Sequence, residues 1–254
     1  MTHEELKYYS SLLRKKYRSS EKKFLVEGKK SVQEGIESNF SCEKIFVSQK
    51  FFDNTRSRKL FKRADVEVLK KSELLRITDT MTPQGITAVF RIPENNKIEE
   101  IKSKTIVYAE NIADPGNLGT IIRICDWFGI ETLLVSDNTV DVYNPKVIRS
   151  SMGSIFHINI IENVESKTLE ILKKKGYKLL CADLQGENLY DLDISNKKII
   201  AFSNESVGPT EELLKRSDYK ITIPKFGKAE SLNVASASAI ILSEIAKKTS
   251  LSEF

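Results

Sequence analysis

Histidine is scarce in this chain, since His3 and His157 are the only two among 254 residues. Three cysteines, Cys42, Cys125 and Cys181, form neither a CxxC pair nor an even set for disulfides. Without a cluster of histidine, cysteine and carboxylate side chains, neither a zinc site nor a Ser-His-Asp triad is expected. The sequence therefore predicts no metal site. Unpaired cysteines are typical of a reducing compartment, so we expect a cytoplasmic protein.

Glycine-rich nucleotide loops and long apolar runs are also missing. Neither GxGxxG nor GxxxxGK[ST] occurs, so the usual dinucleotide and nucleoside-triphosphate loops are not supported. An apolar run such as 239–242 is far too short to span a bilayer, and the N-terminus has no signal-peptide core. We therefore expect a folded protein without a membrane anchor, whose ligand is held by another kind of loop.

The basic residues are concentrated in the first part of the chain. Residues 1–100 carry 21 Lys and Arg against 15 Asp and Glu, whereas the remainder carries 19 against 20. Near the N-terminus the excess surrounds an aromatic side chain, at Arg14, Lys15, Lys16, Tyr17 and Arg18. This combination is typical of contact with a phosphate backbone, and a solvated lysine-rich helix face is the alternative.

Alternating helical and strand patterns divide the chain into two α/β domains. Residues 1–93 predict a small α/β/α domain, 94–103 a polar linker, and 104–254 a domain with a mainly parallel sheet. In the first domain we expect helices at 4–17, 28–39, 53–64 and 71–78 and strands at 24–27, 44–48, 66–69 and 86–91. In the second we expect strands at 105–109, 131–136, 155–160, 178–182, 197–202 and 219–223 and helices at 117–128, 144–151, 165–175, 209–216 and 231–248.

Three polar segments each follow an apolar strand of the second domain, at 111–123, 203–209 and 223–244. Transitions from strand to helix concentrate free backbone N–H groups, and α/β proteins often bind ligands there. One such loop would mean little. Three of them predict a single composite site.

The basic residues of the helices expected at 117–128 and 144–151 each have two possible roles. Asn117 is a good helix N-cap, and Arg123 lies on the second turn of the same helix. Its guanidinium suits a phosphate group, although a surface salt bridge is the plainer role. Lys146 and Arg149 lie three residues apart on one expected helix face, which suits either phosphate contact or solvent.

The other two segments also have plain structural roles open to them. Glu205 suits a hydroxyl-bearing or cationic ligand, or caps a helix that begins near Pro209. Ser231 is a good N-cap for the last helix, and Asn233 lies in its expected first turn. The small residues at 235–239 allow close packing of that helix, including packing against another subunit.

Taken together, these segments resemble the motifs of the SpoU family of RNA 2′-O-ribose methyltransferases, in the SPOUT superfamily. The pattern N-x-x-D-P-x-N-x-G-x-x-x-R matches 111–123 at every specified position, and the third motif matches 223–234. Glu205 and Gly208 match a Glu-x-x-Gly element, and 146–153 match the looser middle motif. Ala235 departs from the serine that many members carry. The segments 24–28 and 82–85 are similar to signatures of the family's L30e-like substrate-binding domain.

The resemblance implies a two-domain α/β fold, an L30e-like domain followed by a SPOUT domain with a trefoil knot. It also implies S-adenosylmethionine as cofactor, a homodimer through the C-terminal domain, and 2′-O-ribose methylation of structured RNA. Ribosomal RNA is preferred, because simpler tRNA enzymes of the family often lack the N-terminal domain. The alternatives are a tRNA 2′-O-methyltransferase, a non-catalytic RNA-binding ribosome-assembly factor and, without the glycine fingerprint, a nucleotide-dependent α/β enzyme.

The same resemblance assigns roles to particular residues. The catalytic group is Arg123, Asn117, Ser231 and Asn233. Arg123 acts on the hydroxyl as base or orienting group, or grips the phosphate and stabilises the developing alkoxide, since a guanidinium pKa lies above about 12. The cofactor pocket is formed by Ser203, Asn204, Glu205, Gly208, Ile223, Pro224, Gly227, Ser231 and Leu232. The residues expected to bind RNA are Arg14, Lys15, Lys16, Arg18, Lys146 and Arg149.

Overall fold

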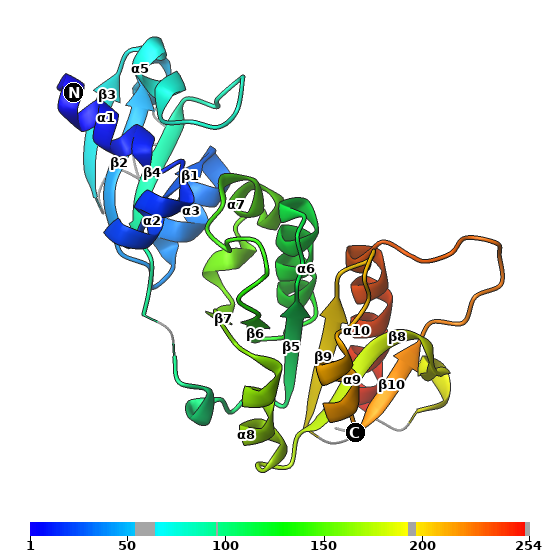
Figure 1. The fold of residues 1–254 in the computed structure, drawn as a ribbon. Coiled ribbons are helices and arrows are strands. Elements are labelled where there is room, and N and C mark those ends of the chain that lie inside the picture. The colour runs from blue at the N-terminus through cyan, green and yellow to red at the C-terminus, as the bar shows by residue number, and fades with distance from the viewer. Residues whose placement is uncertain (54–63, 95, 193–196, 252–254) are drawn as a thin grey trace. The chain divides into compact units, whose positions relative to one another are not determined.

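The structure, a computed structural model, describes residues 1–53, 64–94, 96–192 and 197–251 (Figure 1). It contains two compact units, a first unit of Met1–Glu94 with Asp141–His157 and a second unit of Asn95–Val140 with Ile158–Phe254. Residues 141–157, which the sequence pattern assigned to the second domain, thus pack with the first unit. The domain boundaries at 94–103 stay a prediction, and the helix expected at 53–64 lies outside the described residues.

The first unit is built on a four-stranded sheet in the order β1-β4-β2-β3. The strands are β1 (Lys23–Glu27), β4 (Ile86–Arg91), β2 (Cys42–Ser48) and β3 (Asp65–Leu69). β4 pairs antiparallel with β1 and β2, and β2 pairs parallel with β3. All four expected strands are confirmed to within two residues. The helices are α1 (His3–Ser11), α2 (Lys15–Glu21), α3 (Lys29–Glu37), α4 (Gln49–Phe52), α5 (Lys71–Arg76) and α7 (Pro145–Ser151).

The single helix expected at 4–17 is wrong, because the chain turns between α1 and α2. Leu12, at the end of α1, is fully buried, and its carbonyl accepts a hydrogen bond from Arg18 Nη1 at 2.9 Å. Two short helices allow both Leu12 and Arg18 to point into the unit. Helical periodicity alone did not show this break, because both segments are polar apart from a few positions.

Aromatic rings hold the segment 141–157 to the first sheet. The Tyr143 ring lies 4.6 Å from that of Phe24, and the Phe156 ring lies 5.1 Å from that of Phe90. Gly35 of α3 faces these rings, and a Cβ there would come within 2.5–2.7 Å of Phe90 and Phe156. A larger residue at position 35 would therefore push the rings apart.

This packing explains why the strand expected at 155–160 is wrong. Ser154–Phe156 forms a 3-10 turn, η3, and the strand β7 begins only at Asn159. Residues 155 and 156 are apolar because they pack into the first unit, and not because they alternate along a strand. His157 is consequently half-exposed and lies 3.3 Å from the Glu34 carboxylate.

The second unit contains a six-stranded sheet in which every described pair is parallel, in the order β10-β8-β9-β5-β6-β7. The strands are β10 (Tyr219–Thr222), β8 (Lys178–Asn188), β9 (Lys198–Ser203), β5 (Thr105–Glu110), β6 (Thr132–Val135) and β7 (Asn159–Ile161). Its longer helices are α6 (Pro115–Trp127), α8 (Leu169–Lys173), α9 (Glu211–Arg216) and α10 (Val234–Leu251). The expected mainly parallel α/β fold is confirmed, and the trefoil knot stays a prediction.

Buried apolar side chains explain why these strands are parallel and central. β5, β6 and β9 are buried along almost their whole length, as parallel strands covered on both faces must be. Ile106 and Tyr108 of β5 share a core cluster with Leu172 of α8 and Leu213 of α9. α10 packs against α6 and β9.

β8 contains a bulge that the sequence did not predict. Leu180 and Cys181 pair with Tyr219 and Lys220, whereas the next two residues of β10 pair with Glu187 and Asn188. The intervening residues leave the ladder, and a Cβ at Gly186 would lie 2.6 Å from the backbone of Ile221. The strand expected at 178–182 was therefore too short, because the chain returns to the sheet after the bulge.

The three thiols are poorly suited to act as nucleophiles. Burial raises the pKa of Cys125 and of Cys181 to about 12, and that of the partly buried Cys42 to about 11. All three are free cysteines that stay protonated at neutral pH.

In the described part of the chain, no helix is long and apolar enough to cross a membrane.

We predict that Arg18→Gln lowers the free energy of unfolding by about 3 kcal/mol. Arg18 is buried, and its Nε and Nη2 donate to Asp141 Oδ2 at 2.9 and 2.5 Å. The substitution leaves the poorly exposed Asp141 carboxylate without its cation. Lys15→Gln, at an exposed position of the same helix, is the control and should change stability by less than about 0.5 kcal/mol. Urea unfolding followed by circular dichroism measures both, and equal effects would contradict the prediction.

Candidate active site

A buried carboxylate fixes the loop that follows β9. Glu110, the last residue of β5, is 3% exposed and lies opposite Ser203 in the parallel ladder. Glu110 Oε2 accepts hydrogen bonds from Ser203 Oγ and from the Thr210 backbone N–H, both at 3.0 Å. Glu110 Oε1 accepts from Thr210 Oγ1 at 2.7 Å. One side chain thus holds both ends of the segment 203–210.

Asn111, the residue after Glu110, forms a hydrogen bond with Asn204, within the segment 203–210. Asn204 Nδ2 donates to the backbone carbonyl of Asn111 at 3.2 Å, and Asn204 Oδ1 accepts from the backbone N–H of Ser206 at 2.8 Å. Asn111 adopts a left-handed backbone conformation with φ of 55°, which asparagine tolerates better than most residues. The first and second polar segments are therefore tied together where β5 and β9 end.

A hydrogen-bonded triangle joins all three polar segments. Asn117 Nδ2 donates to Glu205 Oε1, and Asn233 Nδ2 lies 3.1 Å from the same oxygen and 3.0 Å from Asn117 Oδ1. Asn233 Oδ1 accepts from the backbone N–H groups of Ala235 and Ser236, at the start of α10. The expectation of one composite site thus corresponds to direct contacts between residues 88 and 116 positions apart.

Three expected capping roles are wrong. Asp114, and not Asn117, caps α6, since its side chain accepts from the Asn117 N–H at 2.9 Å. Asn233, and not Ser231, caps α10, which begins at Val234. The plainer role of Glu205 as a cap also fails, because Thr210 caps α9. The caps made by Asp114 and Thr210 leave Asn117 and Glu205 available for longer contacts, whereas Asn233 forms both a cap and longer contacts.

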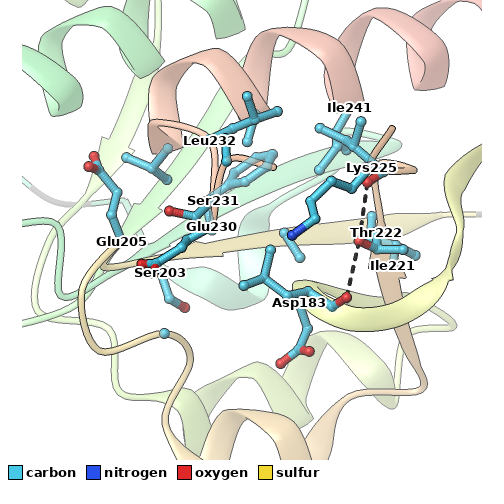
Figure 2. Close-up of a pocket in the computed structure, with 18 of the residues that line it drawn as sticks. Asp183, Ser203, Glu205, Ile221, Thr222, Lys225, Glu230, Ser231, Leu232 and Ile241 are labelled. Atoms are coloured by element: carbon cyan, nitrogen blue, oxygen red, sulfur yellow. Dashed lines mark hydrogen bonds between the residues drawn. The ribbon is translucent and has the colours of Figure 1, made fainter. Parts of the chain in front are cut away.

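A pocket of about 350 Å³ lies beside this triangle, within the second unit (Figure 2). The end of β9 and its loop, the loop between β10 and α10, and the bulge of β8 line it. All nine residues expected to form a cofactor pocket are among its lining, namely Ser203, Asn204, Glu205, Gly208, Ile223, Pro224, Gly227, Ser231 and Leu232. The apolar side chains of Phe202, Ile221 and Ile241 form part of its wall.

The expected catalytic residues are only partly brought together. Asn117 and Asn233 are in contact, and Ser231, two residues before Asn233, lines the pocket. Arg123 lies six residues beyond Asn117, about 9 Å along the axis of α6, and does not line the pocket. Its side chain is exposed and forms no hydrogen bond or ion pair with any described residue. The surface salt bridge considered for it is therefore absent among these residues.

The residues expected to bind RNA belong to the first unit and differ in their availability. Arg14, Lys15 and Lys16 are exposed at the start of α2, and Lys146 is exposed in the first turn of α7. Arg149 is partly exposed and pairs with Asp79 at 2.7 Å. Arg18 is buried against Asp141, as described above, so its guanidinium is not available to an RNA phosphate. No group of side chains in the described chain is arranged to hold a metal ion.

Some lining and supporting residues were missed by the sequence reasoning. Asp183 and Leu184 reach the pocket only because β8 bulges, and nothing in the local pattern indicates this. Glu110 had a usable signal, because a carboxylate at the last position of an otherwise apolar strand needs a partner when buried. Lys225 lines the pocket as well, and follows directly from the expected loop.

Comparison with known proteins now adds to this geometry. Residues 104–243 match the SpoU rRNA Methylase family, and residues 3–88 match the MRM3-like substrate binding domain. The chain belongs to the SpoU rRNA methylase family. The resemblance of its three motifs to that family is confirmed, together with the two-domain α/β fold.

Relatives of this SpoU chain match it along nearly its whole length. It is 32% identical over 241 residues to the 23S rRNA (guanosine(2553)-2′-O)-methyltransferase RlmP of Bacillus subtilis, and the match covers 94% of both chains. A putative RNA methyltransferase of the TrmH family from Porphyromonas gingivalis has a TM-score of 0.86 at 30% identity, covering 96% and 97%. An AdoMet-bound rRNA methyltransferase from Sinorhizobium meliloti has a TM-score of 0.86 at 25% identity, covering 97% and 95%.

We predict that Glu110→Gln lowers the free energy of unfolding by about 1–3 kcal/mol. The amide replaces one acceptor oxygen of a buried carboxylate that three donors engage. Glu211→Gln is the control, because Glu211 is 88% exposed and, among the described residues, forms an ion pair only with Lys215 of its own helix. Urea unfolding compares the two variants. A Glu110→Gln protein as stable as the control would show that the buried carboxylate does not hold the loop.

Proposed function

We propose that this protein transfers the methyl group of S-adenosylmethionine to a ribose 2′-hydroxyl of structured ribosomal RNA, in the large subunit. The hydrogen-bonded triangle of Asn117, Glu205 and Asn233 beside the pocket carries the proposal, because it unites the three segments of a SpoU methylase. The name of the Bacillus subtilis relative, which matches 94% of this chain, specifies 2′-O-methylation of 23S rRNA.

The residues of the pocket fit S-adenosylmethionine. Apolar walls at Phe202, Ile221 and Ile241 suit the adenine ring, and the turns at Gly208 and Gly227 leave backbone groups accessible. The carboxylates of Asp183 and Glu230 suit a cationic ligand. When bound, this cofactor supplies a methyl group on a positively charged sulfur, which leaves as a neutral thioether.

The side chains around the pocket would bind and orient the ribose. A 2′-hydroxyl is a poor nucleophile, so its oxygen must be held in line and its developing negative charge stabilised while its proton is released to solvent as the O–C bond forms. The guanidinium of Arg123, which no described residue engages, suits a phosphate and the adjacent 2′-oxygen. The Ser231 hydroxyl lines the pocket and the Asn233 amide is held by Asn117 and Glu205, which supports a role for both in orienting the nucleotide.

Arg123 lies outside the pocket lining of its own chain, which supports a homodimer through the C-terminal domain. We infer that a second copy packs on α6 and α10 and contributes its Arg123 to the pocket. Trp127, one turn beyond Arg123, is 83% exposed, and an isolated tryptophan so exposed is unusual outside interfaces. Ser236 is exposed on α10, within the small-residue run at 235–239 that permits close helix packing.

The first unit would recognise the folded RNA, and the protein would work in the cytoplasm. Exposed Arg14, Lys15 and Lys16 give this unit basic side chains for phosphate contacts, and residues 3–88 match a substrate-binding domain. A tRNA substrate and a non-catalytic assembly factor are the alternatives. The factor is not favoured, because Arg123, Ser231 and Asn233 are all present.

The direct test is transfer of labelled methyl groups from S-adenosylmethionine to total RNA from a strain that lacks this gene. We expect label in large-subunit rRNA, as a 2′-O-methyl nucleotide, and mapping should first examine the position that corresponds to guanosine 2553 of the Bacillus subtilis relative's substrate. Label in tRNA instead would retain the chemistry and overturn the substrate. Binding of the cofactor without label in any RNA fraction would favour the non-catalytic assembly factor.

A second prediction concerns Arg123 and the dimer. Arg123→Ala and Asn233→Ala should each abolish turnover in pure form, and Arg123→Ala should leave cofactor affinity within about twofold. Mixed dimers of one Arg123→Ala chain and one Asn233→Ala chain can be purified with two different tags. They should recover about half of the wild-type activity, because one of their two sites then has both Arg123 and Asn233. Mixed dimers of two differently tagged Arg123→Ala chains serve as the control. Inactive mixed dimers would show that Arg123 acts on the pocket of its own chain.

A further inference from the structure

The charges that line the pocket are unequal. Asp183, Glu205 and Glu230 are acidic, whereas Lys225 is the one cationic side chain among the described lining residues. Figure 2 shows the Lys225 side chain extending from the loop after β10 with its ammonium end turned into the pocket. An ammonium group is out of place in a pocket for a cationic ligand, unless it faces a negative part of that ligand.

The acidic groups of the pocket do not neutralise Lys225. Glu205 accepts from Asn117 and Asn233, and Asp183 Oδ1 accepts from the Gln185 backbone N–H at 2.7 Å. Within the described chain, Lys225 forms no hydrogen bond or ion pair with any of them or with any other residue. Its three donors are therefore available to a ligand.

The charges of S-adenosylmethionine then restrict where Lys225 can act. The ligand carries a positive sulfonium, a positive α-ammonium and one negative α-carboxylate. The carboxylate is the one anionic group with which a lysine ammonium can form an ion pair. A charge-assisted hydrogen bond between an ammonium and a carboxylate is stronger than a neutral one.

We propose that Lys225 binds the methionine carboxylate of S-adenosylmethionine and thereby selects for ligands that carry this group. The proposal rests on the function proposed above and adds a specificity-determining contact to it. It also fixes the direction of the bound ligand, with the carboxylate at the loop that follows β10. The apolar wall of Phe202, Ile221 and Ile241 then receives the adenine end.

The chain offers a matched control three residues away. Lys228 lies in the same loop and is exposed like Lys225, but it does not line the pocket. Lys225→Gln and Lys228→Gln therefore remove the same charge from the same segment. Any effect of net charge or of loop flexibility should appear in both variants, whereas loss of a direct contact should appear only in Lys225→Gln.

The experiment measures the dissociation constants of S-adenosylmethionine and of decarboxylated S-adenosylmethionine by isothermal titration calorimetry, without RNA. We expect Lys225→Gln to weaken the binding of S-adenosylmethionine about tenfold and that of the decarboxylated ligand less than about twofold. The wild-type preference for the carboxylated ligand should thus nearly disappear in Lys225→Gln. Lys228→Gln should keep both affinities within about twofold.

Other results would overturn this contact without affecting the proposed function. Equal weakening of both ligands by Lys225→Gln would show a structural effect of the loop. Unchanged affinity for both, with a raised KM for RNA, would assign Lys225 to an RNA phosphate instead. In both cases wild-type methyl transfer to RNA would still support the methyltransferase. If the wild-type protein bound neither ligand, the proposed function and this contact would both be wrong, and methyl transfer would be absent as well.

Discussion

The parallel pairing of β5 with β9 is the constraint on which the site depends. It places Glu110 opposite Ser203, at the edge where both strands end and both polar loops begin. A buried carboxylate there must be satisfied by donors, and Ser203 and Thr210 supply them. The loop between these two residues therefore has both ends fixed before any ligand binds. Preorganisation of this kind lowers the entropic cost of binding.

The hydrogen bonds around Glu205 extend this constraint to the other two segments. Glu205 accepts from Asn117 at the start of α6 and from Asn233 at the start of α10. The cap of α6 is made by Asp114, so the Asn117 amide is free to contact Glu205. Asn233 uses its oxygen for the cap and its nitrogen for the site, which is possible because an amide has both donors and an acceptor. The helices α6 and α10, which pack on each other, are thus also joined by side-chain hydrogen bonds at their N-terminal ends, beside the pocket.

The sequence was most informative where a strand is buried on both faces and where a loop has a strict pattern. β5, β6 and β9 were expected near their observed positions, because a short, continuous apolar run bounded by turns is typical of a strand buried on both faces. The strand expected at 155–160 was wrong, because the apolar residues there pack with aromatic rings of the first unit. The prediction that Arg18 binds RNA was wrong for a similar reason. Its basic surroundings predicted RNA contact, whereas the turn at Leu12 directs its guanidinium to Asp141, 123 residues later.

By itself, the sequence determined the two-domain α/β class and the absence of the usual nucleotide and metal motifs, and its motifs carried the family resemblance from which nine of the pocket-lining residues were expected. Periodicity and motif spacing can be recognised in short stretches of the chain. The tertiary structure alone decided which side chains meet: the Glu110 contacts, the triangle around Glu205, the bulge that delivers Asp183, and the separation of Arg123 from the pocket of its own chain. Such contacts join positions up to 116 residues apart. They depend on strand order and helix packing, which no local pattern of residues specifies.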